Sequence, residues 1–307
     1  MQSMYRTACR SFISVIVALL ATAVVATAAS VAVAAPDANE AVAHPFEGVR
    51  HVRWEREGPE PQVAHIVAIA LDTPGIRFKT TEPNGPDAPR DTWCETTYDF
   101  VKRVGAQIGI NANYFILDNE NHTELLGLAV SQGTVVSPWD NGGMRFALNI
   151  TKENTAVFVE RPENGAGGTA TTPTTTLYNA VGGRPMLIRD GDILVKEGGD
   201  RHPRTGVGLT ADNQLLLLVV DGRQPTHSVG MTFHEMATLF QAYDATDALA
   251  LDGGGSTTLV FANPDPEVVN VPMPTTLPVD VTLGPPGIER RNGNNLAVFV
   301  RAKDATE

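Results

Sequence analysis

Cysteine is scarce in this sequence, and its scarcity excludes several kinds of site. The 307 residues include two cysteines, Cys9 and Cys94, and Cys9 lies in an N-terminal segment that we expect to be removed. A single remaining cysteine cannot form an intramolecular disulfide, a thiolate zinc site or a redox pair. We therefore expect Cys94 to be a buried thiol, with a nucleophilic role as the less common alternative.

Positive charge is scarce as well. The sequence has 23 Lys and Arg residues against 35 Asp and Glu residues, which gives a formal net charge of −12. A strongly acidic protein is poorly suited to bind nucleic acid or anionic lipid, because both carry dense negative charge. We therefore expect no nucleic-acid partner.

Long apolar runs are limited to one N-terminal segment, residues 11–35, which contains no charged residue. Arg6 and Arg10 precede it, and Ala-Val-Ala at residues 32–34 offers a small-residue cleavage site. This arrangement favours a secretory signal peptide over residues 1–35, and it predicts a secreted or periplasmic mature protein without stable membrane association. A retained membrane anchor is the alternative, because the run is long enough to span a bilayer.

The rest of the chain has the pattern of one domain with more strand than helix. Residues 36–47 are polar and predict a flexible lead-in to a single domain at residues 48–307, which is long enough to bury one large core. Short β-patterned runs dominate, whereas helical spacing of apolar residues occurs near residues 97–105 and after Thr232. The sequence therefore predicts an α+β fold with a large mixed β-sheet core, two or three helices, and strand-end loops that form one surface pocket.

The segment ALALDGGGSTTLV at residues 248–260 has the strongest local pattern. Its apolar run ends at Asp252, which is followed by Gly253, Gly254, Gly255 and Ser256. Consecutive glycines allow unusual backbone dihedrals or a close approach to a ligand. Free amide N–H groups and hydroxyls beside a carboxylate suit an oxygen-rich anionic or sugar ligand. A tight glycine turn, in which the carboxylate binds only turn backbone, explains the same pattern.

Other polar residues also stand at the ends of predicted strands. Asn111 closes an apolar run, and its amide can both donate to and accept from sugar hydroxyls. Arg204 has the donor geometry for two hydrogen bonds to phosphate, and Asp221 emerges directly after an apolar strand. Arg290 and Asn294 precede the last predicted strand. Turn-forming or surface roles are the simpler explanations for each of these residues taken alone.

Glu235 and the histidines give weaker functional signals. Glu235 stands three residues after Thr232 at a predicted helix start, which is the spacing of a capping box, so a structural role is favoured over a catalytic one. The seven histidines show no zinc-ligand spacing with a cysteine or a second histidine. We therefore predict no metal and no cofactor, while calcium held by loop carboxylates and carbonyls stays compatible with the sequence.

Seven segments of the chain resemble those of the phosphodiester glycosidase family, and they occur in the same order. They fall within about residues 60–300 and read GINANYF, VGGRPMLIRDG, HPRTGVGL, LLLVVDGR, GMTFHEMATLF, DALALDGGGSTTLV and RRNGNNLAVF. The DGGGST loop with the upstream RTG and DGR segments is the most specific part of the resemblance. The chain departs from the family pattern at Asn111-Ala112-Asn113, where many members have Asn-Gly-Gly, and at Arg291-Asn292.

The resemblance implies a set of site residues. Asp252 and Asp221 are the implied catalytic carboxylates. The implied substrate- and phosphate-binding residues are Asn111, Arg204, Thr205, Gly253, Gly254, Ser256, Arg290 and Asn294. Such a reaction needs a carboxylate near the developing oxocarbenium centre or near the attacking water, and positive charge beside the departing phosphate.

The activity implied by the resemblance is hydrolysis of the sugar C1–O bond in a sugar-1-phosphodiester, similar to N-acetylglucosamine-1-phosphodiester, within a phosphorylated glycan. The products are a free sugar and a phosphomonoester. An ordinary glycosidase on the same scaffold is one alternative, since a fold does not fix a substrate. A non-catalytic glycan-binding or exopolysaccharide-assembly protein is another, although a binding protein has less use for two carboxylates facing a cation.

Overall fold

The computed structural model describes residues 38–88, 90–118, 122–140, 143–273 and 287–302, which all belong to one compact unit. The expected signal peptide lies outside these residues. No helix within them has the length and apolar character that a membrane crossing requires. The described chain is mostly strand with two α-helices, which agrees with the predicted single-domain α+β class.

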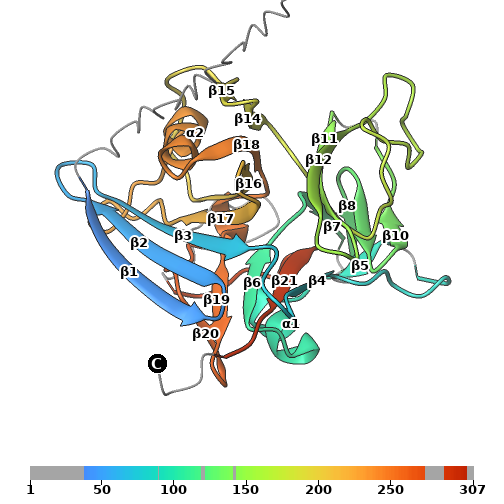
Figure 1. Ribbon diagram of the computed structural model, residues 1–307, viewed down its shortest axis with the longest axis horizontal. Coiled ribbons are helices and arrows are strands. Elements are labelled where there is room, and N and C mark those ends of the chain that lie inside the picture. The colour runs from blue at the N-terminus through green and yellow to red at the C-terminus, as the bar shows by residue number, and fades with distance from the viewer. Residues whose placement is uncertain (1–37, 89, 119–121, 141–142, 274–286, 303–307) are drawn as a thin grey trace, which may run out of the picture. The chain divides into compact units, whose positions relative to one another are not determined.

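An eight-stranded antiparallel sheet is the largest element of the fold (Figure 1). Its strands lie in the order β1 (Asn39–Phe46), β2 (Val49–Arg56), β3 (Gln62–Ala70), β17 (Gln214–Val220), β16 (Arg204–Thr210), β18 (Ala245–Ala250), β14 (Met186–Arg189) and β15 (Asp192–Ile193). The hairpin of β16 and β17 turns at residues 211–213, as the sequence predicts. The strand that leads to Asp252, β18, pairs with β16 on one side and β14 on the other.

Three smaller sheets complete the fold. The first has the order β10 (Thr134–Ser137), β9 (Ala129–Ser131), β13 (Asn179–Gly183), β11 (Phe146–Ile150) and β12 (Ala156–Glu160). The second has the order β20 (Pro266–Val268), β19 (Leu259–Ala262), β6 (Ile108–Asn111), β21 (Asn295–Phe299) and β4 (Arg77–Thr80). The third consists of β5 (Thr92–Trp93), β8 (His122–Leu125) and β7 (Phe115–Leu117).

The strand β17 shows why apolar side chains cover both faces of the largest sheet. Its sequence is QLLLLVV, so every residue after the first is apolar. Successive side chains of a strand point to opposite faces. The residues at odd positions pack into one buried cluster, and those at even positions pack into another. A continuous apolar run is therefore what this position in the sheet requires.

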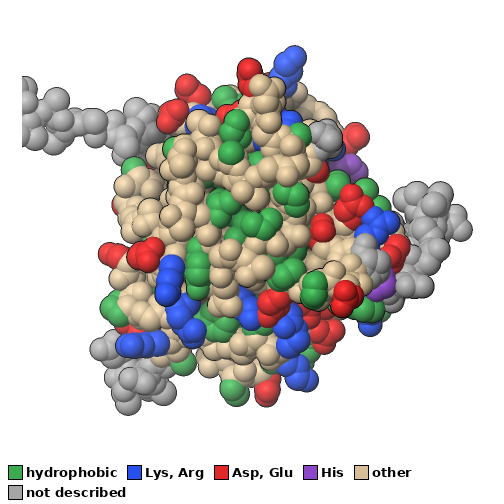
Figure 2. Space-filling view, turned by 90° about the vertical axis from the view of Figure 1, so that its right-hand side faces the viewer, with side chains coloured by type: hydrophobic (Ala, Val, Ile, Leu, Met, Phe, Trp, Pro, Cys, Tyr) green, Lys and Arg blue, Asp and Glu red, His purple; other side chains and the backbone are tan. Residues whose placement is uncertain are grey.

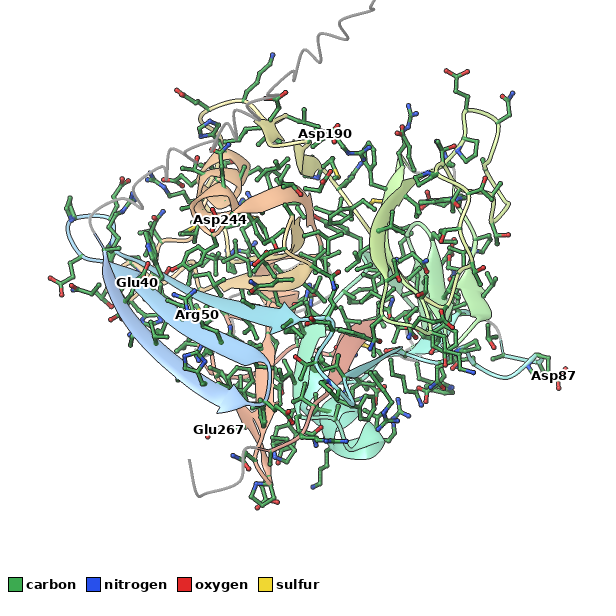
Figure 3. All side chains as sticks on the ribbon, in the orientation of Figure 1. Glu40, Arg50, Asp87, Asp190, Asp244 and Glu267 are labelled. Carbon is green, nitrogen blue, oxygen red and sulfur yellow. The ribbon has the colours of Figure 1, made fainter. Side chains whose placement is uncertain are left out.

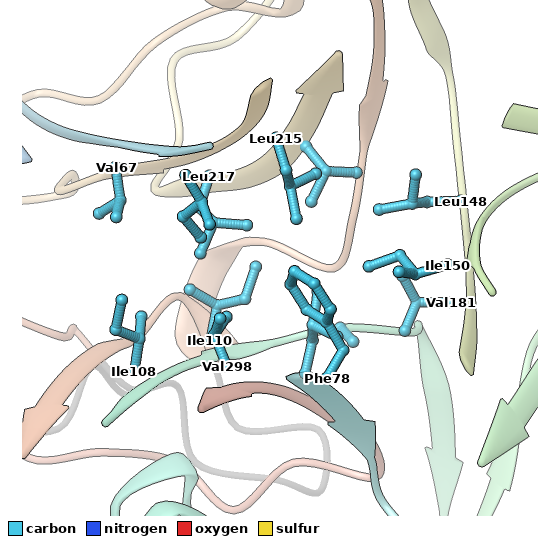
Figure 4. Close-up of a cluster of buried hydrophobic side chains, with 14 of the residues drawn as sticks. Val67, Phe78, Ile108, Ile110, Leu148, Ile150, Val181, Leu215, Leu217 and Val298 are labelled. Atoms are coloured by element: carbon cyan, nitrogen blue, oxygen red, sulfur yellow. The ribbon is translucent and has the colours of Figure 1, made fainter. Parts of the chain in front are cut away.

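The first of these clusters joins the largest sheet to the two five-stranded sheets (Figure 4). Val67 and Leu217 come from the largest sheet, Ile110 and Val298 from β6 and β21, and Leu148 from β11. All five side chains are buried. Each such side chain contributes about 1.5–3 kcal/mol through burial. This shared core fixes the ends of β6, β18 and β21 relative to one another.

The first helix, α1 (Thr97–Val104), begins and ends at residues that the sequence pattern identifies. The side chain of Thr96 accepts a hydrogen bond from the backbone N–H of Asp99, which caps the N-terminus. Gly105 ends the helix with a φ of 72°, a conformation that glycine adopts at little cost. The helix packs its buried residues against β6 and β21.

The second helix, α2 (Phe233–Ala242), covers the other face of the largest sheet. Met236 and Phe240 belong to the second buried cluster. The predicted capping box is confirmed, because Thr232 accepts from the N–H of Glu235 while the Glu235 carboxylate accepts from the N–H of Thr232. Arg201 donates to the same carboxylate at 2.7 Å, so Glu235 has structural partners on two sides.

Two details of the fold differ from the prediction. All the strand pairs in the described part of the chain are antiparallel, and they form four sheets in place of one mixed sheet. Residues 39–46, expected to belong to a flexible lead-in, form the edge strand β1. Six of its eight residues are exposed, so backbone pairing with β2 holds the strand in place. Its residues therefore lack the hydrophobic pattern that would predict a strand from the sequence.

A pair of histidines couples the stability of this sheet to pH. His51 on β2 and His65 on β3 share a hydrogen bond of 3.0 Å between Nε2 and Nδ1, and their rings stack. Burial lowers the pKa of each imidazole from 6.5 to about 4, and Asp221 partly opposes the shift of His65. The unfolded chain binds protons once the pH falls below 6.5, whereas the folded chain stays neutral here down to about pH 4. Stability therefore falls as the pH decreases through this window.

We expect His65→Gln to reduce the pH dependence of stability, because it removes one of the two titrating groups. The His65 imidazole should account for about 3 kcal/mol of the loss in unfolding free energy between pH 7 and pH 4. Urea unfolding of both proteins at the two pH values measures the difference. His44→Gln, at an exposed position of β1, is the control and should follow the wild type. Parallel pH curves for wild type and His65→Gln would contradict this account.

Candidate functional site

The loop that begins at Asp252 is held against the ends of two other strands. The backbone N–H of Asp252 donates to the carbonyl of Ala112, beyond β6, at 2.9 Å. The N–H of Gly254 donates to the carbonyl of Pro203, just before β16, at 2.8 Å. A β-carbon at Gly253 would lie 2.7 Å from that same carbonyl oxygen, and Gly254 has a φ of +60°. The glycines are therefore required by close backbone approach and by a left-handed conformation.

The Asp252 carboxylate has two side-chain partners on the same oxygen. Ser256, at the end of the short 3-10 helix η1 (Gly254–Ser256), donates to Oδ2 at 2.5 Å. Arg290 Nη2 lies 3.1 Å from the same atom and also donates to the Ser256 hydroxyl. The carboxylate side chain keeps 13% of its surface exposed. Burial raises its pKa, while Arg290 and Ser256 act in the opposite direction.

A second arginine, Arg223, lies beside this loop. A β-carbon at Gly254 would lie 3.0 Å from Arg223 Nη2, which places the guanidinium against the loop backbone. Nη1 is buried and has no hydrogen-bond partner in the described part of the chain. Burial and Arg290 lower the pKa of Arg223, while Asp252 raises it. An unpartnered buried guanidinium N–H beside a carboxylate is a donor that a ligand oxygen can satisfy.

Arg223 was not among the site residues predicted from the sequence. The DGR segment predicts a site role for Asp221 and gives no separate signal for Arg223. The structure gives Arg223 a φ of 60°, in the left-handed region, and places its guanidinium against Gly254. A positive φ at a non-glycine residue cannot be foreseen from the residue types around it.

Arg204 makes a different set of contacts. Its Nε and Nη2 donate to the backbone carbonyls of Met231 and Asp200, both at 3.0 Å. Its guanidinium carbon lies 3.9 Å from the centre of the Phe233 ring. These contacts brace the start of α2 against β16. The donors of Arg204 that the sequence predicts to bind phosphate are therefore occupied by protein groups. A phosphate-binding role for Arg204 stays a prediction.

Tyr114 was also absent from the predicted set, although it stands in the GINANYF segment. Its hydroxyl donates to the carbonyl of Arg184 at 3.3 Å. Burial raises the pKa of Tyr114 to about 12, with Asp252 acting in the same direction and Arg204 opposing it. These electrostatic effects mean that the phenol lies near both charged groups. Tyr114 therefore keeps its proton at neutral pH, and this proton is used in the hydrogen bond to the carbonyl of Arg184.

Asn111 ties the strand ends of the site together. Its amide nitrogen donates to the carbonyl of Asp252 at 2.5 Å. Its amide oxygen accepts from the Thr205 hydroxyl at 2.7 Å and from the N–H of Thr258 at 3.2 Å. Asn111 and Thr205 are buried, so both lie beneath the loop and position it.

Asn294 lies farther from the carboxylate. Its amide nitrogen donates to Asn113 Oδ1 at 2.8 Å, and its amide oxygen accepts from the N–H of Thr81 at 3.2 Å. Asn113 in turn accepts from the N–H of Gly182 at 3.0 Å. Since both amides are buried and satisfied by protein groups, this pair joins β6, β13 and β21. Direct substrate contact by Asn294 stays a prediction.

Asp221 is buried and engaged on both oxygens. Oδ1 accepts from Asn270 Nδ2 at 3.0 Å and from the N–H of Val271 at 2.9 Å. Oδ2 lies 2.8 Å from Nε2 of His227. Asn270 also donates to the carbonyl of Thr257, so Asp221 is connected to the Asp252 loop through one intervening side chain.

The predicted residues thus fall into two groups. Asp252, Gly253, Gly254, Ser256 and Arg290 form one contact cluster, with Asn111 and Thr205 directly below it. Asp221, Arg204 and Asn294 form their hydrogen bonds with other groups of the described chain. Within the residues that the structure describes, no three His, Cys, Asp or Glu side chains are arranged to hold a metal ion.

We expect Asn111→Ala to destabilise the protein by about 2–4 kcal/mol, because it leaves buried donors and acceptors of three segments without partners. Urea unfolding measures the loss. Asn84→Ala is the control, since Asn84 is only partly buried and its amide makes one hydrogen bond, of 3.3 Å, to Arg90. Equal, small losses in both variants would show that Asn111 does not hold the strand ends together.

Comparison with known proteins identifies the family to which this chain is similar. The model of the phosphodiester glycosidase family matches residues 104–299. N-acetylglucosamine-1-phosphodiester alpha-N-acetylglucosaminidase of Mus musculus is 28% identical over 216 residues, which are 64% of this chain and 39% of the mouse protein. The Bos taurus protein of the same name is 30% identical over 203 residues, which are 60% of this chain and 36% of the bovine protein.

A solved structure shares the fold. It is the zebrafish N-acetylglucosamine-1-phosphodiester alpha-N-acetylglucosaminidase catalytic domain auto-inhibited by pro-peptide, with a TM-score of 0.62 and 19% identity. The likeness covers 86% of this chain and 88% of the zebrafish chain. Because the family model matches well over half of its length, this chain belongs to the phosphodiester glycosidase family.

Proposed function

We propose that this chain is an exported hydrolase that cleaves the sugar C1–O bond of sugar-1-phosphodiesters in glycans. The observation that carries the proposal is the placement of the Asp252 carboxylate beside two arginines, one of which, Arg223, has a buried N–H without a partner. The mouse and bovine relatives bear the name of an enzyme for N-acetylglucosamine-1-phosphodiesters, which supports this substrate class.

The proposed reaction is a hydrolysis that consumes one water molecule. The bond between sugar C1 and the phosphate oxygen breaks, and its electron pair leaves with the phosphate. The oxygen of one water molecule bonds to C1, and one water proton is released or passed to the phosphomonoester. A phosphate leaving group is already a weak base, so strong protonation by a general acid is less necessary than in ordinary glycoside hydrolysis.

Asp252 is the carboxylate best placed to act on the reacting carbon or on the attacking water. It is partly exposed, whereas Asp221 is 1% exposed and both of its oxygens already accept hydrogen bonds. Ser256 and Arg290 hold Oδ2 of Asp252 and fix the orientation of the carboxylate. In this proposal Asp252 is catalytic, and Asp221 positions the loop through Asn270.

Arg223 is the group best placed to receive the departing phosphate. Arg290 is already engaged with Asp252 and Ser256, and Arg204 with two backbone carbonyls. Among the described residues, Nη1 of Arg223 is buried and has no acceptor. Nε of Arg290 also has none, but Nη2 of Arg290 already binds Asp252 and Ser256. Positive charge fixed at Arg223 stabilises the charge that develops on the leaving group.

The alternative activities differ in the substrates that they would accept. An ordinary glycosidase would cleave nitrophenyl glycosides better than phosphodiesters. A non-catalytic glycan-binding protein would cleave neither. A screen that measures free sugar released from UDP-N-acetylglucosamine, from other sugar-1-phosphate diesters and from nitrophenyl glycosides distinguishes the three, and cleavage of the phosphodiesters alone is the result we expect.

We expect Asp252→Asn to abolish phosphodiester cleavage while leaving the fold intact. The amide keeps the shape and hydrogen bonds of the side chain but loses the negative charge, so turnover should fall about a thousandfold or more. Rates at saturating substrate measure this loss, and the melting temperature reports on folding. A folded Asp252→Asn protein with near-normal turnover would remove Asp252 from the mechanism.

We expect Arg223→Lys to lose about tenfold or more in kcat/KM on phosphodiesters and much less on a neutral glycoside, since an ammonium cannot replace the guanidinium fork on a phosphate. Arg204→Lys is the comparison variant. Its contacts are structural, so we expect similar losses on both substrates. If Arg223→Lys also loses both activities equally, Arg223 supports the loop and does not bind phosphate.

A further inference from the structure

A cavity of about 510 Å³ lies between α1, the edge strand β4 and the sheet of β9 to β13. Its volume falls within the range of about 300–1,000 Å³ that small-molecule sites occupy. Its lining includes Arg77, Lys79, Lys152, Asn154, Tyr178 and Phe299.

This cavity lies at the opposite end of β21 from the candidate active site. Asn295, at one end of the strand, pairs with Asn111 beneath the Asp252 loop. Phe299, at the other end, pairs with Arg77 in the cavity. Four steps along an extended strand cover about 13 Å. A single sugar unit bound in the cavity therefore cannot also contact the residues of the Asp252 cluster.

The lining of the cavity is cationic in a protein of net charge −12. Three of its lining residues are basic, and none is acidic. By contrast, acidic and basic side chains are interspersed on the face of the molecule shown in Figure 2. The carbonyl end of α1 brings some partial negative charge to the cavity through Val104 and Gly105. Lys79 is paired with Glu82, and the charges of Arg77 and Lys152 outweigh that partial charge.

Two of the three cations are free to bind a ligand. Within the described ranges, Arg77 and Lys152 have no carboxylate at ion-pair distance, whereas Lys79 pairs with Glu82. The Arg77 guanidinium carbon lies 4.7 Å from the centre of the Phe299 ring, and this stacking leaves the edge of the guanidinium open for two hydrogen bonds to an anion. Tyr178 adds an aromatic side chain and Asn154 adds an amide.

The walls of the cavity are held in place by hydrogen bonds between its strands. Asn179 donates to the carbonyl of Phe78 at 3.0 Å and accepts from the N–H of Gln132 at 3.1 Å. Asn154 donates to the carbonyl of Ile76 at 2.7 Å. These bonds tie β13, the turn between β9 and β10, and the turn between β11 and β12 to β4. The cavity is therefore formed before a ligand arrives, which lowers the entropy cost of binding.

We propose that this cavity is a binding site for an anionic segment of a glycan, separate from the Asp252 cluster. Arg77 and Lys152 bind the anionic group, Tyr178 contacts the face of a sugar ring, and Asn154 binds a hydroxyl, while Phe299 holds the Arg77 guanidinium in place. A free inorganic anion would use the two cations and leave the aromatic and amide groups unused. Binding of the glycan at this cavity does not depend on whether the chain hydrolyses phosphodiesters.

The test measures binding of a sulfated heparin hexasaccharide to the full-length protein by calorimetry. Uncharged maltohexaose, inorganic phosphate and a single-stranded oligonucleotide are the comparison probes. We expect the hexasaccharide to bind more tightly than all three and to weaken as salt is raised, since exposed charges are screened. Equal affinity for phosphate would mean that the cavity binds simple anions. Tighter binding of the oligonucleotide would mean that it binds nucleic acid. Either result overturns the proposal.

The double variant Arg77→Ala with Lys152→Ala should weaken hexasaccharide binding at least tenfold. The control is Arg50→Ala with Lys196→Ala, which also removes one stacked arginine and one exposed lysine. Arg50 lies on β2 over the ring of Tyr243, far from the cavity lining (Figure 3). The control should bind normally, and so should Asp252→Asn. Undiminished binding by the double variant, or equal loss in the control, would refute the cavity as the site.

Discussion

The amide of Asn111 is the contact on which the arrangement of the candidate site depends. One planar group, buried at the end of β6, binds the carbonyl of Asp252, the hydroxyl of Thr205 and the N–H of Thr258. Asp252 and Thr258 belong to one loop, whereas Thr205 and Asn111 are distant from it in sequence. These segments approach one another because the shared core aligns β6, β16 and β18. In an apolar surrounding each of these hydrogen bonds is strong, and leaving any partner unmade is costly. The position of the Asp252 carboxylate is thus set by the buried amide of Asn111.

Features encoded locally were predictable from the sequence. The continuous apolar run of β17, the cap at Thr232 and the turn at residues 211–213 each depend on residue types within a few positions of one another. The DGGGST loop also belongs here, since its glycines are explained by one close carbonyl and one positive φ. Family resemblance then added Arg290, which is 38 residues away from Asp252 and contacts it directly.

The features that could not be predicted from the sequence depend on backbone conformation or on partners that are distant in the chain. The side-chain direction of Arg223 follows from a left-handed backbone, and its unpartnered N–H exists only because the Asp252 loop packs beside it. Arg204 looked suited to phosphate, yet two backbone carbonyls from other segments occupy its donors. The strand β1 has almost no apolar burial, so only its pairing with β2 defines it.

The electrostatics of the loop connect the two arginines to the choice of substrate. Burial alone raises the pKa of Asp252, and the raised value persists although Arg290 and Arg223 both favour the ionised form. A bound phosphodiester adds another negative charge nearby, which by itself raises that pKa further. An enzyme that needs an ionised carboxylate beside an anionic substrate therefore requires more cationic charge than a glycosidase acting on neutral sugars. In the proposed mechanism this charge comes from Arg223, whose Nη1 has no hydrogen-bond partner among the described residues and whose guanidinium lies against the Asp252 loop.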